Sequence, residues 1–388
     1  MGASGFIAGK ISTKGRLAMV CVAVSFLVMI IAVAVSSGFR TEIRNGISDI
    51  SGDIQLLPIS QDYISEDSSI SRHPEYLPYI EDMPQVQSLA PVVYRAGLIR
   101  HEENIHGVLF KGVENPADTG SLAVSIPRRL STILGLEVGD DMTTYFIGDR
   151  IKARKFHVAS VYDGIVENQD KLVVFASIED IQRLNGWDED QVSAFEIKVY
   201  PSLRTKRMLS EIEQEVGFIS STYLGDDDGT VYASSSVSSY PQMFDWLDLI
   251  DFNVVFILIL MTIVAGFNMI SGLLIMLFEN ISTIGLLKAL GMKDKDISKV
   301  FLISSSKIVL KGMLAGNLLA IIFCVVQSTT HVLTLPPQNY FVSFVPVHLN
   351  IAVVIAADLI SYLGIMALLL VPTLFISKVD PADTVRVN

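Results

Sequence analysis

Charged residues are scarce in this 388-residue sequence, and three long stretches contain none at all. Lys, Arg, Asp and Glu make up 18% of the chain, whereas soluble domains contain about 25%. The uncharged stretches hold 23, 27 and 46 residues and lie between Arg16 and Arg40, between Asp251 and Glu279, and between Lys311 and Asp358. Because about 20 apolar residues cross a bilayer, the missing charge excludes an ordinary soluble protein and predicts membrane spans.

Cysteine is almost absent. The two cysteines, Cys21 and Cys324, both fall inside the uncharged stretches. The long segment 40–245 therefore cannot use disulfides, and its own hydrophobic core must hold it together. Its length is enough for one large subdomain or two small ones.

Positive charge is also short in that segment. Residues 40–245 contain 18 Lys and Arg against 33 Asp and Glu. A surface that binds nucleic acid needs clustered Lys and Arg, so nucleic acid is not an expected partner. The segment is predicted to be an acidic domain exposed to water.

Motifs for catalysis, metal binding and nucleotide binding are missing as well. The sequence has neither G-x-x-x-x-G-K-[ST] nor G-x-S-x-G, and its six histidines show no metal-ligand spacing. The acidic triplet 226–228 lacks the alternate ligands and closing Glu of an EF-hand, so we expect a solvated turn there. We predict no catalytic residue, no metal site and no cofactor bound by this chain. Any ATP hydrolysis must come from another polypeptide.

Four transmembrane helices are expected, because the longest uncharged stretch splits at a turn-forming cluster, 334–339. The predicted segments are an N-terminal stretch 1–16, a span 17–39, an outer domain 40–245, a span 246–278, a connection 279–300, a span 303–327, a loop 328–348, a span 349–376 and a tail 377–388. A cleaved signal peptide is the alternative for the first span. Its 23 uncharged residues exceed the roughly 7–15 of a signal peptide's apolar core, which favours a retained span.

Lysine and arginine set the expected orientation. They cluster before the first span, between the second and third, and after the fourth, whereas the loop 328–348 carries no charge. Positive residues beside spans stay in the cytoplasm. Both termini and the connection 279–300 are therefore expected inside, with the 40–245 domain outside.

Short β-branched runs alternate with helical patterns in the outer domain. The predicted strands lie near 53–59, 86–94, 106–113, 156–162, 172–175 and 195–200. The clearest predicted helices are 128–134, 177–184 and 202–216. The expected fold is an integral membrane α-helical protein with four transmembrane helices and a large mixed α+β domain between helices 1 and 2.

Three residues inside the predicted spans are candidates for an interface or a cavity. Gly312 and Gly316 form a G-x-x-x-G, which lets helix backbones approach closely. Asp358 lies near the start of the last span, and a carboxylate facing lipid at mid-bilayer costs about 2.5–3.5 kcal/mol. It is expected to face a subunit interface or a wet cavity, unless a tilted helix puts it at the outer rim.

The connection 279–300 is a short amphipathic segment. We expect Ile284, Leu287 and Leu290 on one face, and Gly291 can end the helix. The pattern alone favours a helix lying on the membrane surface. However, the residues I-G-L-L-K-A-L-G at 284–291 resemble the signature E-I-G-I-L-[RK]-A-[LI]-G of permeases related to the lipoprotein-releasing LolC/LolE proteins and the MacB exporters. Thr283 stands where that family commonly has Glu.

The resemblance to Lol-type permeases extends along the chain. Residues 36–44 are similar to the exit of their first span, with Ser37 in place of the usual Asn, and residues 127–140 to a motif of their outer domain. Residues 346–350 resemble the entry to their last span, and residues 380–386 resemble their C-terminal tail.

The resemblance implies a permease that works by transmitting motion. The implied coupling helix, which docks into a cytoplasmic ATPase, consists of Ile284, Gly285, Leu286, Leu287, Lys288, Ala289, Leu290 and Gly291. ATP and Mg would bind the ATPase. The resemblance also implies a second permease, identical or homologous, a lipoprotein cargo, a periplasmic carrier, membrane lipids around the spans, and the inner membrane of a bacterium.

Other functions compete with lipoprotein release. MacB-like efflux and FtsX-like envelope regulation keep the same permease fold, although the large outer domain disfavours the FtsX-like role. A membrane sensor is a third hypothesis. It would need a cytoplasmic output module, and the sequence offers only the connection 279–300.

Overall fold

The computed structural model describes residues 16–373 apart from 61–63, 65, 67, 102–103, 115–119, 149, 165–171, 226–227, 337–339 and 341. The predicted tail 377–388, nearly all of the predicted N-terminal stretch 1–16 and most of the acidic triplet 226–228 lie outside these residues. The chain divides into two compact units. The helical unit contains 1–40, 247–334 and 344–388, and the α+β unit contains 41–246 and 335–343.

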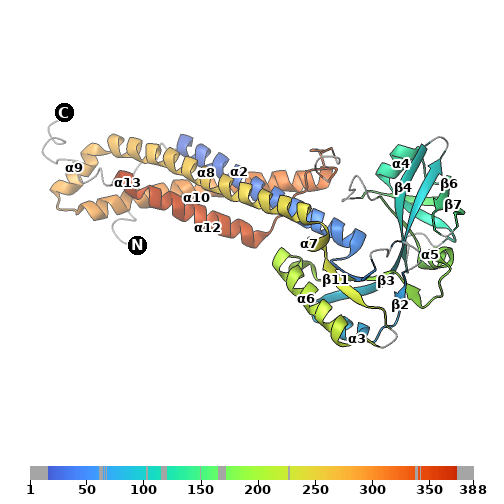
Figure 1. The fold of residues 1–388 in the computed structure, drawn as a ribbon. Helices are drawn as coiled ribbons and strands as arrows, with labels where there is room; N and C mark the ends of the chain where they lie inside the picture. The colour runs from blue at the N-terminus through green and yellow to red at the C-terminus, as the bar shows by residue number, and fades with distance from the viewer. Residues whose placement is uncertain are drawn as a thin grey trace. The chain divides into compact units, whose positions relative to one another are not determined.

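Long apolar helices build the helical unit (Figure 1). They are α2 (Arg16–Ser51), α8 (Pro241–Glu279), α10 (Asp294–Thr330), and α12 (Ile351–Leu368) followed by α13 (Leu370–Thr373). By length and composition, four helical segments in the described chain can cross a membrane. The predicted fold class is confirmed.

Two of these helices are longer than their apolar stretches. α2 continues past Arg40 to Ser51, and Ile43 and Ile47, four residues apart on one helix face, are buried in its last turns. α8 already begins at Pro241, because proline suits the first turn of a helix. Each of these two helices therefore contributes residues to both units.

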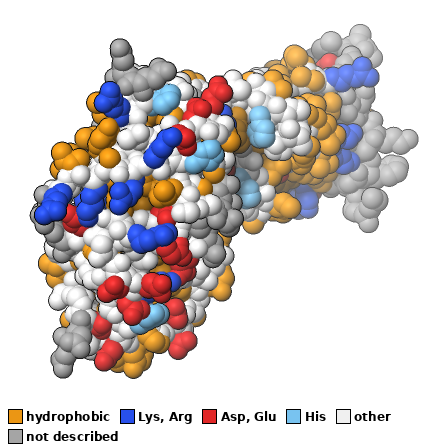
Figure 2. Space-filling view, turned by 90° about the vertical axis from the view of Figure 1, so that its right-hand side faces the viewer, with side chains coloured by type: hydrophobic (Ala, Val, Ile, Leu, Met, Phe, Trp, Pro, Cys, Tyr) orange, Lys and Arg blue, Asp and Glu red, His pale blue; other side chains and the backbone are white. Residues whose placement is uncertain are grey.

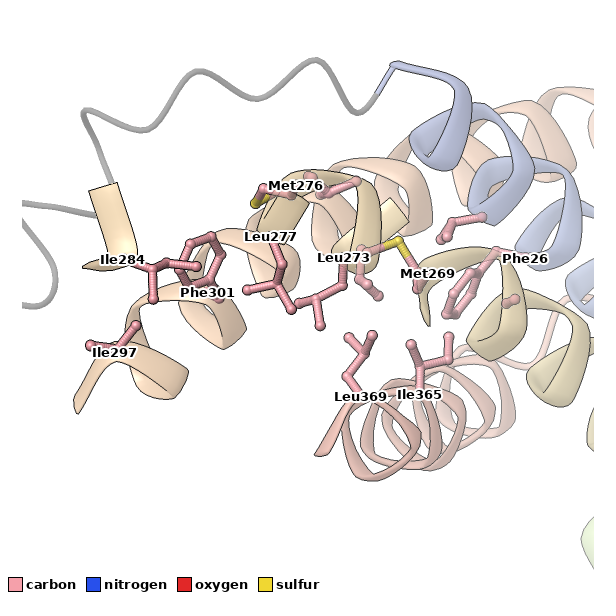
Figure 3. Packing of buried hydrophobic residues seen from close by; sticks show 14 of the residues in the cluster. Phe26, Met269, Leu273, Met276, Leu277, Ile284, Ile297, Phe301, Ile365 and Leu369 are labelled. Carbon is pink, nitrogen blue, oxygen red and sulfur yellow. The ribbon is translucent and has the colours of Figure 1, made fainter. Parts of the chain in front are cut away.

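The core of the helical unit consists of apolar side chains from all four long helices. Figure 3 shows Phe26 of α2 beside Met269 of α8, with Ile365 of α12 and Leu369 close by. Other large apolar side chains of the same helices are exposed, such as Phe256 and Leu318. Many hydrophobic side chains are visible on the part of the helical unit that Figure 2 shows. Apolar surface of this extent suits contact with lipid.

A nine-stranded sheet forms the α+β unit, in the order β11-β1-β10-β3-β4-β8-β5-β7-β6. Its strands are β1 (Ile54–Pro58), β3 (Val86–His101), β4 (Asn104–Val113), β5 (Ala123–Pro127), β6 (Asp141–Phe146), β7 (Lys152–Tyr162), β8 (Val173–Ser177), β10 (Ala194–Val199) and β11 (Val231–Ser235). β3 also pairs with β6, so six strands close into a ring. The side chains of Phe110, Phe146 and Phe156 fill the space inside these six strands, and the centroids of their aromatic rings are 5.0–6.1 Å apart.

The remaining strands, β11, β1 and β10, continue the sheet on the other side of β3. β3 therefore belongs both to the closed ring and to this open part. The helix α6 (Lys206–Thr222) packs on β11 and on α3 (Leu77–Glu81), as Figure 1 shows. A two-stranded sheet of β2 (Ile70–Ser71) and β9 (Gln191–Val192) completes the strands of the described residues. Mixed charge covers this unit in Figure 2.

The predicted elements of this unit are largely present. α4 (Arg128–Leu134) has the predicted bounds, and α5 (Ile178–Asn185) starts after Ser177. The helix predicted from 202 instead begins at Lys206, because Pro201–Leu203 forms a 3₁₀ turn and the Thr205 side chain caps the helix by accepting from the Met208 N–H.

Candidate coupling segment and the helices that hold it

The candidate coupling segment folds as α9 (Ile281–Ala289), between α8 and α10. Gly291 has φ +86°, a left-handed conformation that suits glycine and ends the helix, as the sequence predicts. The chain then turns at once into α10, which starts at Asp294. Lys288 Nζ and Asp294 Oδ1 lie 3.0 Å apart, so an ion pair joins α9 to the first turn of α10.

One face of α9 packs inward. Ile284 is 1% exposed and shares an apolar cluster with Leu277 of α8 and Ile297 and Phe301 of α10; Figure 3 shows it beside Phe301. Gly285 is buried beside it, and Leu287 is partly buried against the same cluster. These contacts hold α9 to the helical unit.

The opposite face of α9 is exposed. Leu286 is 56% exposed and Leu290 is 76% exposed. The residues of this outer face of α9 are Ser282, Thr283, Leu286, Ala289 and Leu290. Exposed leucines on a short helix provide a small apolar surface for another molecule.

The expectation that Leu290 shares a face with Ile284 and Leu287 was wrong. Six residues of an α-helix turn about 600°, which places Leu290 roughly 120° away from Ile284. The eight predicted coupling residues therefore divide into two groups, an inward one around Ile284 and an outward one around Leu286. A strict 3.6-residue period could have found this division from the sequence.

Gly312 and Gly316 bring α10 against α2. A Cβ at Gly312 would lie 2.8 Å from Val22 Cγ1, and one at Gly316 would lie 3.0 Å from Phe26 Cβ. Backbone atoms of α2 are equally near, including the Met19 carbonyl oxygen at 2.9 Å from the Gly312 position. The two glycines are therefore contact points between two helices of the same chain.

Asp358 lies on α12 and faces α10. The Asn317 side-chain Nδ2 donates a hydrogen bond of 2.5 Å to Asp358 Oδ2. Two further polar bridges hold α12, one between Ser306 of α10 and the Tyr362 hydroxyl and one between Thr262 of α8 and Ser361. Sequence reasoning missed Asn317, whose only signal was an amide in an uncharged stretch.

Two of the segments that resemble Lol-type permeases, 36–44 and 346–350, are in contact near the end of the apolar stretch of α2. The backbone N–H of His348 donates to the Ala34 carbonyl at 3.0 Å. A Cβ at Gly38 would overlap the Pro346 carbonyl and lie 2.7 Å from the Val347 nitrogen. Only a residue without a side chain allows this approach, and we call the contact of 34–38 with 346–348 the exit clasp.

An ion pair lies next to the exit clasp. Arg40 of α2 pairs with Asp251 of α8, and the Ser36 hydroxyl donates to the same carboxylate at 3.0 Å. Arg40 directly follows the first uncharged stretch, and Asp251 directly precedes the second. Their pairing fixes α2 to α8 at that level.

The C-terminal end of α2 is anchored inside the α+β unit. Lys111 of β4 is 2% exposed, and its Nζ donates to the Ile50 carbonyl at 2.7 Å and to Glu196 Oε2 at 2.6 Å. Burial lowers the pKa of Lys111, although the Glu196 carboxylate raises it. Gly52, with φ +68°, ends the helix.

Asp53 and Arg204 reinforce this anchor. Asp53 Oδ2 accepts from the Val199 backbone N–H at 2.8 Å and from Arg204 Nε at 3.0 Å. Arg204 also donates to the Asn45 side chain of α2 at 2.8 Å. Burial raises the pKa of Asp53, and the Arg204 guanidinium and the Val199 N–H oppose this shift.

The sequence predicts no metal site. Among the residues that the structure describes, no group of three or more His, Cys, Asp or Glu side chains is placed to hold a metal ion.

Comparisons with known proteins show similarity to membrane permeases. Residues 255–381 match the family model described as FtsX-like permease C-terminal. The lipoprotein-releasing system transmembrane protein LolC of Xylella fastidiosa strain Temecula1 is 21% identical over 406 residues, covering 97% of this chain and 95% of LolC. The corresponding LolE of Haemophilus influenzae is 21% identical over 400 residues, covering 93% of this chain and 91% of LolE.

One solved structure aligns with about half of the chain. The periplasmic region of MacB from Actinobacillus actinomycetemcomitans aligns with a TM-score of 0.32 and 12% identity, over 49% of this chain and 91% of that one. The sequence matches confirm the resemblance to LolC/LolE-type permeases along nearly the whole chain, and residues 255–381 match the model of the FtsX-like permease C-terminal region.

Proposed function

We propose that this chain is the permease subunit of an ATP-driven transporter that extracts lipoproteins from a bacterial inner membrane. The outer face of α9 is the observation that carries the proposal, because it presents Leu286 and Leu290 to solvent on a helix fixed from behind by Ile284. Separate ATPase chains would dock there and would bind ATP and Mg. A second permease, identical or homologous, would supply the second docking helix.

Contacts along the chain give a route for motion. A push on α9 reaches α10 through Ile284 and through the Lys288–Asp294 ion pair. α10 meets α2 at Gly312 and Gly316, and α2 runs without a break to Ser51. Its end is anchored in the α+β unit by Lys111, so movement of α2 would move that unit.

The proposed orientation follows from charge. Lys288 lies in the last turn of α9, and Lys293, Lys295 and Lys299 follow it, so α9 and both termini would lie in the cytoplasm and the α+β unit in the periplasm. Cargo would enter sideways from the outer leaflet and leave to a periplasmic carrier. The LolC and LolE relatives belong to lipoprotein-releasing systems, and the proposal extends this role to the present chain.

Replacing Leu286 by aspartate is expected to uncouple the ATPase. The charge would lie on an exposed face, so folding should be spared, while an apolar docking contact would lose affinity by about 10-fold or more. Co-purification of the ATPase and ATP hydrolysis in proteoliposomes measure the effect. Ile105→Asp is the matched control, because Ile105 is 63% exposed on β4 and belongs to the α+β unit. Equal ATPase recovery with both variants would count against docking at α9.

Depleting the protein is expected to leave outer-membrane lipoproteins in the inner membrane. Membrane fractionation followed by detection of several lipoproteins measures their location. Normal sorting together with increased drug sensitivity would instead support MacB-like efflux, and normal sorting with chained cells would support FtsX-like envelope regulation. Recovery of the intact protein without any ATPase would favour the sensor hypothesis.

A further inference from the structure

The pair of Asn317 and Asp358 leaves two oxygens without partners among the residues that the structure describes. Asn317 Nδ2 donates to Asp358 Oδ2 at 2.5 Å, and the other oxygen of each group, Oδ1, is buried with no hydrogen-bond partner among the described residues. Buried polar atoms are nearly always satisfied, so this double deficit calls for an explanation. Both unpaired atoms belong to side chains that are already joined.

An ionised Asp358 cannot explain the arrangement. An ionised carboxylate only accepts hydrogen bonds, and the Asn317 oxygen also only accepts, so neither can satisfy the other. Ionisation would additionally leave a negative charge within an apolar helical segment, which is unfavourable without a partner of opposite charge.

No charged partner faces the pair among the residues that the structure describes. α10 carries Lys307 and Lys311, but in the described structure Asp358 Oδ2 is bonded to Asn317 and Asp358 Oδ1 has no partner. α12 has no other charged residue, and its Tyr362 hydroxyl is bonded to Ser306. α8 and α2 have no charge between the residues that border their uncharged stretches.

We propose that Asp358 binds a proton and forms a reciprocal carboxylic acid–amide pair with Asn317. The proton on Asp358 makes that oxygen a donor to Asn317 Oδ1, while Asn317 Nδ2 donates to the carboxyl group in return. One proton thus removes the charge and satisfies both orphan oxygens. The neutral pair joins α12 to α10 through two hydrogen bonds, and loss of the proton would remove the one from Asp358 to Asn317 Oδ1.

Infrared spectroscopy of the full chain in lipid nanodiscs tests the proposal directly. We expect a carbonyl stretching band of a protonated carboxylic acid at neutral pH that shifts in D₂O and disappears in Asp358→Asn. Absence of this band from the wild-type spectrum, or its persistence in Asp358→Asn, would overturn the assignment. The readout does not depend on the cargo or on the ATPase.

Thermal unfolding supplies a second test. Asp358→Asn keeps a neutral side chain that can exchange two hydrogen bonds with Asn317, so its Tm should stay within about 4 °C of the wild type. Asp358→Leu leaves Asn317 unpaired and should lower the Tm by more than that. A large loss of Tm in Asp358→Asn would show that the negative charge is used, which contradicts the proposal. The infrared measurement needs only the wild type and Asp358→Asn, so it stays decisive if Asp358→Leu fails to fold.

Discussion

Gly38→Leu is expected to abolish transport while leaving the chain in the membrane. Any side chain at position 38 would overlap the Pro346 carbonyl and crowd the Val347 nitrogen, so the loop before α12 would have to leave α2. Overpacking of this kind costs about 1–3 kcal/mol. It would also break the hydrogen bond from His348 to Ala34.

Disulfide crosslinking can measure this loss of contact. A cysteine pair at positions 34 and 348 should crosslink readily in the parent chain and at least 10-fold less after Gly38→Leu. Gly217→Ala is a control for glycine replacement, because a Cβ there has ordinary space at 3.7 Å from Ala233. Unchanged crosslinking and transport in Gly38→Leu would refute the exit clasp.

Lys111→Met is expected to destabilise the α+β unit by about 3–5 kcal/mol, because it leaves the buried Glu196 carboxylate uncompensated. The change also removes the hydrogen bond to the Ile50 carbonyl at the end of α2. Lys111→Met with Glu196→Gln should recover part of the stability, since the unpaired charge is then gone. Faster hydrogen exchange in β4 and β10 and a lower Tm of the full chain measure the loss.

A nearby exposed pair provides the control for Lys111. Lys198 Nζ lies 2.8 Å from Asp49 Oδ1, with side chains 37% and 71% exposed. Exposed ion pairs contribute about 0–1 kcal/mol, so Lys198→Met should change the Tm little. Similar destabilisation by Lys111→Met and Lys198→Met would mean that the buried pair is not the anchor of α2.

The sequence predicted helices and their ends best where a single strong physical requirement determines them. Uncharged stretches identified all four long helices, because a bilayer tolerates few charges. Local signals also placed α4, whose end is fixed by Gly135 at φ +67°. The left-handed glycine at position 291 ended α9 for the same reason.

Other features depend on contacts between residues that are far apart in the chain. The pairing of β3 with β6 closes a ring of strands, which the residue pattern of a single strand cannot predict. Asn317 and Asp358 are separated by 41 positions, as two helices bring them together. The clasp of Gly38 with Pro346 likewise joins two motifs that look independent in the sequence.

The composition of the complex tests the central claim most directly. Native mass spectrometry of the protein, extracted gently from its membrane, should find this permease with a second permease and two copies of an ATPase. The ATPase should disappear from the spectrum after Leu286→Asp and remain after Ile105→Asp. A wild-type permease that carries no ATPase would contradict the account.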